Sequence, residues 1–388
     1  MPIPTRFPFR YAPLGALALF AACSQPVKPE HEVITAQAVV PSAPSAAVAA
    51  PAPVAPAAPT PVAVPTATPV VADAPAGTPP TQEKIDTFVA EAEKLSGMPA
   101  AEIRNWLAQA RFQQSIINAI TRPAEGKPWK DYRPIFLTDT RISQGRTFLA
   151  EHRTEVDRVA AQTGVPAEMI VSIMGVETSY GRITGSYRVL DALYTLAFHF
   201  PRREPFFRSE LMHVFALVRE EKLDLATVKG SYAGAMGWGQ FMPSSYRNYA
   251  RDGDGDGRRD LLGSVRDAFA SIANYFIGHG WQRDQPVMLR AVKDAAAPAF
   301  VPDNYEARYT LAELAARGYR PAEPGAPDQP VSVVTLEGVN GPEHWIIYKN
   351  FWVITRYNRS PLYATAVYQL SREIAGTPVR AALPEPTP

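Results

Sequence analysis

One stretch of this sequence restricts the possible folds more than any other: the nearly unbroken apolar run Met169–Val176, which ends in the acid Glu177. Pro166 precedes the run, where a helix tolerates a missing N–H, and Gly181 can close it in the left-handed conformation. An apolar run with these boundaries predicts one buried helix of about three turns. Any fold of this chain therefore has to surround that helix with other segments.

The acid at the end of the run is the first candidate for a catalytic residue. Burying an ionised carboxylate without a partner is so unfavourable that the group tends to stay protonated near neutral pH, the state that a general acid needs. A glutamate at a helix end can also turn outward into water, as surface acids do. The segment alone therefore predicts a candidate general acid at Glu177 and leaves the surface alternative open.

The composition allows a sizeable core and argues against nucleic-acid binding. With 388 residues the chain has room for two or three domains, and 46% of its residues are hydrophobic. The formal net charge is +1, so no large basic face of the kind that binds nucleic acid follows from the composition. We expect a monomeric protein with no nucleic-acid partner.

The N-terminal residues resemble a bacterial lipoprotein signal. Two arginines precede the short apolar stretch 14–22, and Cys23, the only cysteine of the chain, follows it directly. The stretch is too short to span a bilayer as a helix, but it fits a signal peptide with a thiol at the cut site. We expect residues 1–22 to be a signal peptide and Cys23 to be lipidated, with ordinary secretion and a chance cysteine as the alternatives. Because Ser24 rather than Asp follows the cysteine, the resemblance implies a lipid anchor at the periplasmic face of the outer membrane.

The next segment, residues 23–80, is predicted to be a flexible tether. It is rich in Ala and Pro, and Pro41–Ala72 contains no charged residue. Such a segment has no periodic apolar face and too many prolines for a helix or a sheet, so we expect it to be disordered and partly extended. It would let a folded domain work at a distance from the membrane.

From residue 81 onward the pattern becomes helical. Apolar residues recur at helical spacing from Ile85 to Leu95, and Gly97 supplies a stop. Further helical stretches are predicted at 103–110, 141–162, 166–180, 188–199, 204–221, 264–279, 351–357 and 363–374. They predict a helical region at 81–286, completed by C-terminal helices within 349–376, with a loose tail at 377–388.

Residues 287–348 have a different pattern between these helical parts. Short β-like runs at 287–292, 331–336 and 345–348 surround a small helix at 311–317, which ends at Gly318. We therefore expect a small β-containing subdomain inserted into a helical protein.

The segment Gly230–Tyr246 is rich in glycine and aromatic residues. Glycines allow the backbone to approach a ligand closely, and flat side chains cover sugar faces with little loss of entropy. The segment therefore predicts the lining of a binding groove. The alternative is a packed loop whose glycines serve turns and whose aromatic rings serve the core.

Six motifs resemble those of the membrane-bound B type of lytic murein transglycosylases, a lysozyme-like family. They are Gly175-Val176-Glu177-Thr178, Leu190-Asp191-Ala192-Leu193, Phe200-Pro201-Arg202-Arg203, the segment 230–246, Asn274-Tyr275-Phe276 with His279-Gly280-Trp281, and Thr355-Arg356-Tyr357-Asn358. They occur in the family's order over nearly all of 81–375. The resemblance implies a mainly α fold, with a lysozyme-like helical core, an additional helical domain, a small β-containing insertion and a disordered tether before them.

The resemblance also implies a reaction. In this family the acid of the Gly-Val-Glu motif is the only catalytic carboxylate, which assigns that role to Glu177, and we find no convincing second acid in the sequence. Such an enzyme cleaves the β-1,4 bond between N-acetylmuramic acid and N-acetylglucosamine, and the 6-hydroxyl of the substrate replaces water and forms a 1,6-anhydro sugar. No cofactor is needed for this chemistry. The alternatives are a hydrolytic muramidase and a non-catalytic, calcium-stabilised protein that binds peptidoglycan glycan strands.

Seven further residues are assigned to substrate binding by the resemblance. Ser231 and Gln240 match polar groups around the acid, and Arg203 is expected to face carboxylates of the peptide. The others are the groove aromatics Tyr132, Tyr275 and Tyr357 and the amide Asn358. For each tyrosine, core packing with a bonded hydroxyl is an equally good interpretation. Phe206 stands where the family leads us to expect a tyrosine.

A run of acids at 252–267 predicts a cation site. Asp252, Asp254 and Asp256 occupy positions 1, 3 and 5 of an EF-hand-type loop, where clustered oxygens suit Ca²⁺. Arg258 would offer its backbone carbonyl. Because the usual glutamate at position 12 is absent, the resemblance assigns the closing ligand to Asp267 and implies a weak, structural Ca²⁺ site. The alternative is a solvated acidic turn.

Overall fold

The structure is a computed structural model that describes residues 78–121 and 127–379. The expected signal peptide, the lipidation site Cys23, residues 23–77 of the expected tether and residues 380–388 of the tail lie outside the described residues. All described residues belong to one compact unit.

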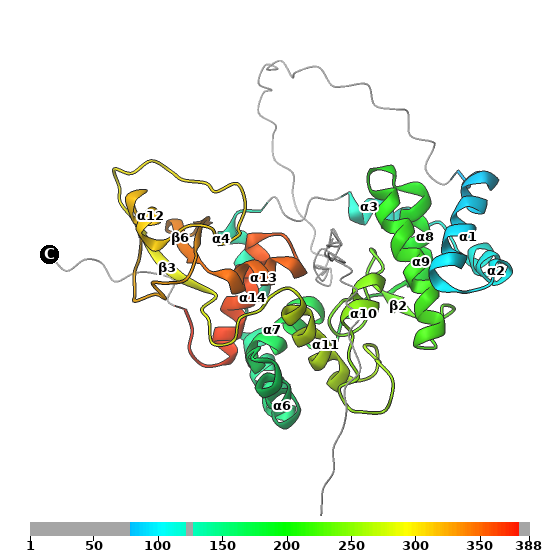
Figure 1. The fold of residues 1–388 in the computed structure, drawn as a ribbon, viewed down its shortest axis with the longest axis horizontal. Coiled ribbons are helices and arrows are strands. Elements are labelled where there is room, and N and C mark those ends of the chain that lie inside the picture. The colour runs from blue at the N-terminus through cyan, green and yellow to red at the C-terminus, as the bar shows by residue number, and fades with distance from the viewer. Residues whose placement is uncertain (1–77, 122–126, 380–388) are drawn as a thin grey trace, which may run out of the picture. The chain divides into compact units, whose positions relative to one another are not determined.

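The fold is mainly α-helical, as the sequence predicts (Figure 1). The helices are α1 (Gln82–Ser96), α2 (Ala100–Gln109), α3 (Gln114–Ile120), α4 (Trp129–Phe136), α5 (Asp139–Glu151), α6 (Arg153–Thr163), α7 (Ala167–Thr178), α8 (Val189–His199), α9 (Glu204–Glu220), α10 (Pro243–Tyr249), α11 (Val265–Gly278), α12 (Leu311–Ala316), α13 (Lys349–Tyr357) and α14 (Pro361–Ile374), with a short 3-10 turn at Pro201–Arg203. Three of them, α3, α4 and α10, were not predicted from the sequence.

The predicted helix 141–162 is in fact two helices, α5 and α6, which meet at His152. His152 leaves the helical conformation, with φ −111° and ψ 21°. Its ring packs on Phe148 at 4.6 Å and on Phe269 of α11 at 5.7 Å. The continuous apolar spacing across the break hid it in the sequence, because both helices pack their apolar faces on the same core.

The buried helix expected from the apolar run is α7. All of its residues except Glu168 are buried, and it packs against α5, α6, α11 and α14 (Figure 1). The expectation that Gly181 closes the helix is wrong, because α7 already ends at Thr178, and Ser179 and Tyr180 both adopt positive φ, 50° and 62°. Thr178 stabilises this turn: its hydroxyl accepts a hydrogen bond from the Gly181 N–H (2.9 Å) and donates to the Trp238 carbonyl (3.0 Å).

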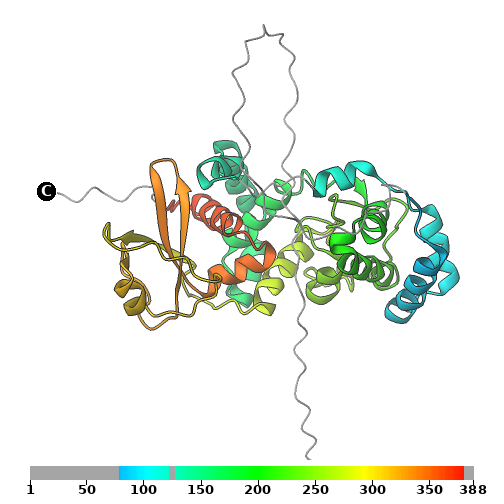
Figure 2. The ribbon, with the colours of Figure 1, turned by 90° about the horizontal axis from the view of Figure 1, so that it is seen from above.

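The strands form two small antiparallel sheets. The larger one has the order β4-β3-β6-β5, with β3 (Met288–Lys293), β4 (Tyr319–Pro321), β5 (Ser332–Gly338) and β6 (Gly341–Ile347), and Figure 2 shows the β5–β6 hairpin. Its side chains Tyr319, Val333 and Ile346 form a core cluster with Leu314 of α12 and Val331. Strand β4 was not predicted, since it has three residues and ends in Pro321. The second sheet pairs β1 (Tyr187–Arg188) with β2 (Lys229–Gly230).

The glycine-rich segment is only partly irregular. Met236 forms isolated bridges to Gly230 and to Phe241, and the helix α10 then starts at Pro243. The sequence indicated turns up to Tyr246, but Pro243 begins a helix because its missing N–H is tolerated in the first turn.

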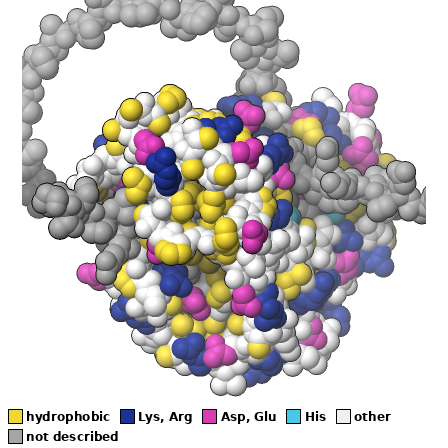
Figure 3. All heavy atoms as spheres, turned by 60° about the vertical axis from the view of Figure 1, so that its left-hand side comes forward, with side chains coloured by type: hydrophobic (Ala, Val, Ile, Leu, Met, Phe, Trp, Pro, Cys, Tyr) yellow, Lys and Arg dark blue, Asp and Glu magenta, His cyan; other side chains and the backbone are white. Residues whose placement is uncertain are grey.

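The described surface carries charges of both signs. On the face shown in Figure 3, Lys and Arg side chains are interspersed with Asp and Glu, and hydrophobic side chains gather near the centre. Within 78–121 and 127–379, no single helix is long and apolar enough to cross a membrane, and only α6 joined to α7, with a bend of 114° between them, has the required length and composition.

Candidate active site

Glu177 lies in the last turn of α7 with 7% of its surface exposed. Burial raises the pKa of its carboxyl from 4.5 to about 8, because the surrounding helices offer little solvation for a negative charge. At neutral pH the side chain is therefore mostly protonated. The outward-facing alternative left open by the sequence is excluded.

Tyr363, in the first turn of α14, is the hydrogen-bond partner of Glu177. Its hydroxyl donates to Oε1 of Glu177 over 2.6 Å, whereas Oε2 makes no hydrogen bond with any described residue. The start of α14 is fixed by Asn358, whose Oδ1 accepts the N–H of the N-cap Ser360 at 2.9 Å. One carboxyl oxygen is thus held by the protein, and the other can carry the proton.

Among the described residues, the other buried acids have stronger partners than Glu177 has. They are Asp191, Glu210, Glu221 and Asp267. Each accepts at least one backbone N–H, and two of them also pair with an arginine. Such partners favour the ionised form or fix the carboxyl in place. Glu177 is the buried acid that has neither a backbone N–H nor a cation as a partner in the described chain, which suits proton transfer.

Aromatic side chains lie around the acid. The Tyr357 hydroxyl donates to the Gly239 carbonyl at 3.1 Å, and the Glu177 charge adds to the effect of burial in raising the pKa of Tyr357 well above its usual range. The ring of Tyr275 lies 4.7 Å from that of Tyr357, and its hydroxyl donates to the Arg356 carbonyl at 2.7 Å. Tyr132 of α4 is close enough to Tyr363 to contribute to raising that residue's pKa, after burial and Glu177. The three predicted tyrosines are therefore all buried near the acid or near each other.

Gln240 and Ser231 belong to the glycine-rich segment and shape its backbone. Gln240 has a φ of 50°, and its Nε2 donates to the carbonyls of Thr184 and Gly237, both at 3.0 Å. The Ser231 hydroxyl accepts the N–H groups of Ala233 and Ala235 at 3.3 and 3.1 Å. A non-glycine residue at positive φ stores strain, and such strain clusters at functional sites.

Arg203 lies at the start of α9, beside a different acid. Its guanidinium stacks over the rings of Phe206 and Phe207, at 4.6 and 4.9 Å from their centres. The neighbouring acid is Glu210, which accepts the Ser244 N–H (2.9 Å) and hydroxyl (2.6 Å). Burial raises the pKa of Glu210 to about 7, while the Ser244 hydrogen bonds and the Arg203 charge lower it. Phe206, in place of the expected tyrosine, thus serves as a platform for Arg203.

Sequence reasoning missed two of these residues, Tyr363 and Glu210. Tyr363 has a usable signal, since Ser360-Pro361 marks a helix start and places Tyr363 in the first turn, just after the Tyr357-Asn358 motif. Glu210 has a signal as well, because helical spacing places it between Phe207 and Val214 on the buried face of α9.

The predicted cation site is a cluster of three exposed carboxylates. Oxygen atoms of Asp252, Asp254 and Asp256 all lie within 4.8 Å of one another. Gly255 and Gly257 allow this turn with φ values of 84° and 88°, and their N–H groups donate to Asp252 at 2.6 and 2.8 Å. No described Lys or Arg pairs with the three acids. Converging carboxylates without a counter-charge fit a hard divalent cation such as Ca²⁺.

Asp267 does not join this cluster. It is fully buried at the start of α11, where its two oxygens accept the N–H groups of Gly253 (2.8 Å) and Asp260 (2.6 Å). Arg258 donates its own N–H to Asp256 at 2.8 Å and extends its side chain to the Glu221 carbonyl at 3.3 Å. Asp267 therefore holds both ends of the loop, and its role as an ion ligand stays a prediction.

Comparison with known proteins agrees with this geometry. The family profile described as "Transglycosylase SLT domain" matches residues 80–372. "Membrane-bound lytic murein transglycosylase B" of Escherichia coli (strain K12) is 38% identical over 310 residues, which cover 77% of this chain and 84% of that protein.

Three solved structures are similar in fold. The soluble lytic transglycosylase SltB1 from Pseudomonas aeruginosa is 47% identical, with a TM-score of 0.71 over 76% of this chain and 98% of that chain. Escherichia coli Slt35 in complex with calcium is 37% identical, with a TM-score of 0.69 over 75% and 92%. SltB3 from Pseudomonas aeruginosa in complex with NAG-anhNAM-pentapeptide is 30% identical, with a TM-score of 0.68 over 78% and 82%.

The helical fold, the buried acid and these similarities agree on one assignment. The chain belongs to the lytic transglycosylases that carry the transglycosylase SLT domain.

Proposed function

We propose that this lytic transglycosylase cleaves the β-1,4 bond between N-acetylmuramic acid and N-acetylglucosamine in peptidoglycan, with Glu177 as its single acid and base. The observation that carries the proposal is the state of that carboxyl. It is buried, its pKa is raised to about 8, and its one hydrogen-bond partner in the described chain is the Tyr363 hydroxyl. A neutral acid with one unbound oxygen can donate a proton at physiological pH.

The reaction needs two proton transfers at the same carboxyl. Glu177 first donates its proton, from Oε2, to the glycosidic oxygen, and the N-acetyl group of the substrate stabilises the cationic sugar carbon. The 6-hydroxyl of the muramic acid then attacks that carbon, and the Glu177 carboxylate takes its proton. Tyr363 keeps its hydrogen bond to Oε1 throughout and stabilises the transient carboxylate.

The intramolecular attack yields a 1,6-anhydro sugar and returns Glu177 to its protonated form. No second carboxylate is required, in contrast to ordinary glycosidases, which place two carboxyl groups about 5 to 9.5 Å apart. The complex of SltB3 with NAG-anhNAM-pentapeptide supports an anhydro product in this family.

We assign the substrate groove to the residues around this acid. Tyr132 and Tyr357 interact with Tyr363, the partner of Glu177, so we place them at the scissile bond. Gln240 follows Gly239, whose carbonyl accepts the Tyr357 hydroxyl, so we place it at the edge of the same site. Tyr275 supports Tyr357, and Asn358 supports the start of α14. Ser231 and Arg203 stay assigned to the groove on resemblance, and Arg203, stacked on Phe206, carries the positive charge that a peptide carboxylate would meet.

We further propose that the acidic loop holds a structural Ca²⁺. Asp252, Asp254 and Asp256 would supply carboxylate oxygens, and Arg258 its backbone carbonyl. The calcium complex of Slt35 supports this choice of ion. The ion would cross-link the loop and has no step in the reaction.

At the membrane, we propose a lipid at Cys23 that anchors a monomeric enzyme to the periplasmic face of the outer membrane. The name of the Escherichia coli relative, "membrane-bound", supports membrane association. Intact-mass measurement of the membrane fraction should find Cys23 acylated and residues 1–22 removed, and light scattering of the detergent-solubilised protein should give the mass of one chain. An unmodified Cys23 behind an intact Met1 would disprove the anchor.

The central experiment compares Glu177→Gln with Glu168→Gln. Both acids are on α7, but Glu168 lies in the first turn, away from the site. Wild type and Glu168→Gln should clear a suspension of purified sacculi, and Glu177→Gln should lose activity by a factor of about 10³ or more. Equal clearing by the two variants would remove Glu177 from the mechanism.

Mass analysis of the released fragments separates the alternatives. Anhydro-muropeptides are lighter by one water than the reducing ends that a hydrolytic muramidase releases. Reducing ends as the main product would replace the transglycosylase mechanism by hydrolysis. Binding to sacculi without any fragment release by the wild type would favour a calcium-stabilised binding protein.

A further inference from the structure

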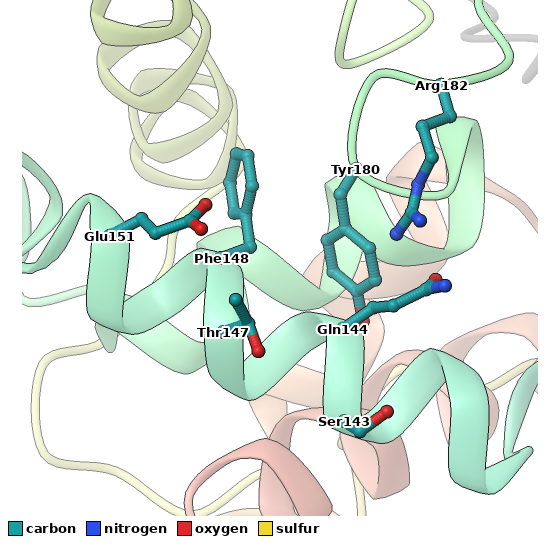
Figure 4. A pocket seen from close by; sticks show the side chains of 7 residues that line it. All are labelled: Ser143, Gln144, Thr147, Phe148, Glu151, Tyr180 and Arg182. Carbon is teal, nitrogen blue, oxygen red and sulfur yellow. The ribbon is translucent and has the colours of Figure 1, made fainter.

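A pocket lies against α5. It has a volume of ≈ 360 Å³, and its lining comes from α5 and from the turn that follows α7 (Figure 4). Glu177 is not among the lining residues.

The pocket has opposite charges at its two ends. Figure 4 shows Glu151 on one side, beside Phe148, and Arg182 on the other, with its guanidinium directed toward Gln144. Gln144 and Glu151 are two turns of α5 apart, which separates the two ends by about 10 Å along the helix. An extended diamino acid has a comparable length.

Neither charge is compensated by the protein. Glu151 makes no hydrogen bond or ion pair with any described residue, and Arg182 uses its Nε to donate to the Ser179 carbonyl at 3.0 Å. Arg141 lies close by: burial lowers its pKa, and the Arg182 charge lowers it further. In the described chain neither arginine pairs with an acid. Arg141 does not line the pocket and donates to the Gly175 carbonyl, so Arg182 is the guanidinium that favours the binding of an anion at this end.

The wall between the two ends is apolar and aromatic. The rings of Phe148 and Tyr180 lie 5.6 Å apart and face the pocket (Figure 4). Hydroxyl groups of Ser143 and Thr147 lie on the same side of α5. Together with the two charges, this wall suits an aliphatic chain that carries an ammonium group at one end and a carboxylate at the other, whereas an uncharged sugar would leave both charges without a partner.

The pocket lies behind the catalytic helix. Gly175 and Glu177 are two residues apart, about 200° around α7, so they face opposite sides. The Tyr180 ring fills the Gly175 side, since a Cβ at Gly175 would lie 2.8 Å from it. A ligand in the pocket would therefore contact Tyr180 and would not reach the acid.

We propose that this pocket binds a zwitterionic diamino acid of a peptide, with its carboxylate at Arg182 and Gln144 and its ammonium at Glu151. Stem peptides of peptidoglycan carry such groups, so the pocket would hold a peptide of a strand that is not being cut. That choice of source rests on the proposed function. The same side chains would bind a free peptide that carries these groups equally well.

The binding test uses the intact protein with Glu177→Gln, so that no substrate is consumed. The probe is a synthetic tripeptide of alanine, glutamate and a terminal diamino acid with free amine and carboxylate, titrated by calorimetry. Glu151→Gln and Arg182→Gln should each weaken binding about tenfold. Asp139→Asn, at the other end of α5, is the matched control and should leave affinity unchanged. A tripeptide ending in norleucine amide should bind no better to the wild-type pocket than to the variants.

The kinetic test identifies the source of the peptide. With active enzyme and peptide-bearing glycan, Glu151→Gln should raise KM about tenfold and leave kcat unchanged, while KM for peptide-free glycan should not change. Tripeptide binding without this KM difference would assign the pocket to free peptides. No tripeptide binding, or equal binding by both variants, would overturn the site. These outcomes do not depend on whether Glu177 is the catalyst, which the clearing of sacculi tests separately.

Discussion

Burial and the Tyr363 hydroxyl change the pKa of the Glu177 carboxyl in opposite directions. Burial raises its pKa to about 8, and the hydrogen bond from Tyr363 lowers it. The second effect stabilises the carboxylate that forms after the first proton transfer. Tyr363 therefore adjusts the pKa of Glu177 and does not itself take part in bond cleavage.

Replacing Tyr363 by Phe should make this adjustment measurable. The pKa of Glu177 should rise further, so the alkaline limb of the kcat/KM profile should move to higher pH, while kcat should fall about tenfold because the carboxylate loses a partner. Tyr368→Phe is the control, since Tyr368 is on the same helix and its hydroxyl makes no hydrogen bond with a described residue. An unchanged pH profile in Tyr363→Phe would contradict the role of the hydrogen bond.

The raised pKa of Glu177 also lowers the free energy of unfolding at neutral and alkaline pH, as proton linkage requires. Between pH 4.5 and about 8 the folded state keeps the Glu177 proton that the unfolded state loses, so the free energy of unfolding falls as pH rises through this range. Glu177→Gln removes the effect. The free energy of unfolding of the variant should equal that of the wild type near pH 4 and exceed it by roughly 4 kcal/mol at pH 8.

Urea unfolding at several pH values checks this expectation. The difference in the free energy of unfolding between the two proteins should grow steadily from pH 5 to pH 8. A difference that is constant with pH would mean that Glu177 is solvated in the folded protein.

The sequence predicted the position of the acid but not its partner. The apolar run made Glu177 a candidate general acid, but the local pattern left an outward-facing side chain as an alternative, and the burial of Glu177 is decided by the fold. Tyr363 comes 186 residues later, and only the packing of α14 on α7 brings the two side chains together. The contact between Tyr363 and Glu177 depends on the tertiary fold, so it cannot be predicted from the sequence around either residue.

Among the elements, the crossing of α5 and α7 depends on small residues. Arg141 of α5 donates to the Gly175 carbonyl at 2.6 Å, and the Tyr180 hydroxyl donates to the Arg141 carbonyl at 2.8 Å. A Cβ at Gly145 would lie 2.4 Å from the Tyr180 hydroxyl. The crossing fixes the end of α7 and, with it, the position of Glu177.

Gly175→Ala should disturb this crossing. Its new methyl group would meet the Tyr180 ring, which is itself confined under α5, so we expect a loss of about 1–3 kcal/mol in the free energy of unfolding and a lower kcat. In Gly175→Ala combined with Tyr180→Leu the smaller side chain leaves room, and part of the loss should be recovered. Strictly additive effects of the two changes would show that they do not interact.

The boundaries of helices and strands could be predicted from apolar spacing in some parts of the chain and not in others. The long helices with regular apolar spacing, such as α9 and α11, were predicted to within one residue at each end. The break at His152 and the three-residue strand β4 were missed, because tertiary contacts set them. Helix α4 was missed as well, since Pro134 inside it argues against a helix in any local interpretation.

At the scale of the whole molecule, the acidic loop connects several helices. It leads from α10 to α11, Arg158 of α6 donates to the Gly253 carbonyl at 2.5 Å, and Arg259 pairs with Glu221 at the end of α9. Helix α11 in turn packs on α7. The acidic loop is therefore linked through α11 to α7, the helix that carries Glu177.

Calcium should stabilise the entire folded unit through this loop. An ion that binds only the folded state raises the melting temperature, and saturating Ca²⁺ should raise it by a few degrees, more than Mg²⁺ does. Asp254→Asn should remove most of the shift, while the exposed Asp328→Asn should retain it. No shift of the wild type at millimolar Ca²⁺ would favour a solvated acidic turn.

The neutral state of Glu177 has a consequence for inhibition. A cationic sugar mimic would be attracted to the ionised carboxyl, which is a minority of the free enzyme below about pH 8. Its apparent Kd should therefore fall about tenfold for each unit of pH up to that value. Binding should also release one proton per molecule, which calorimetry in buffers of different ionisation enthalpy can count. Compound screens in acidic buffer would overlook iminosugar-type ligands that a mildly alkaline assay would find.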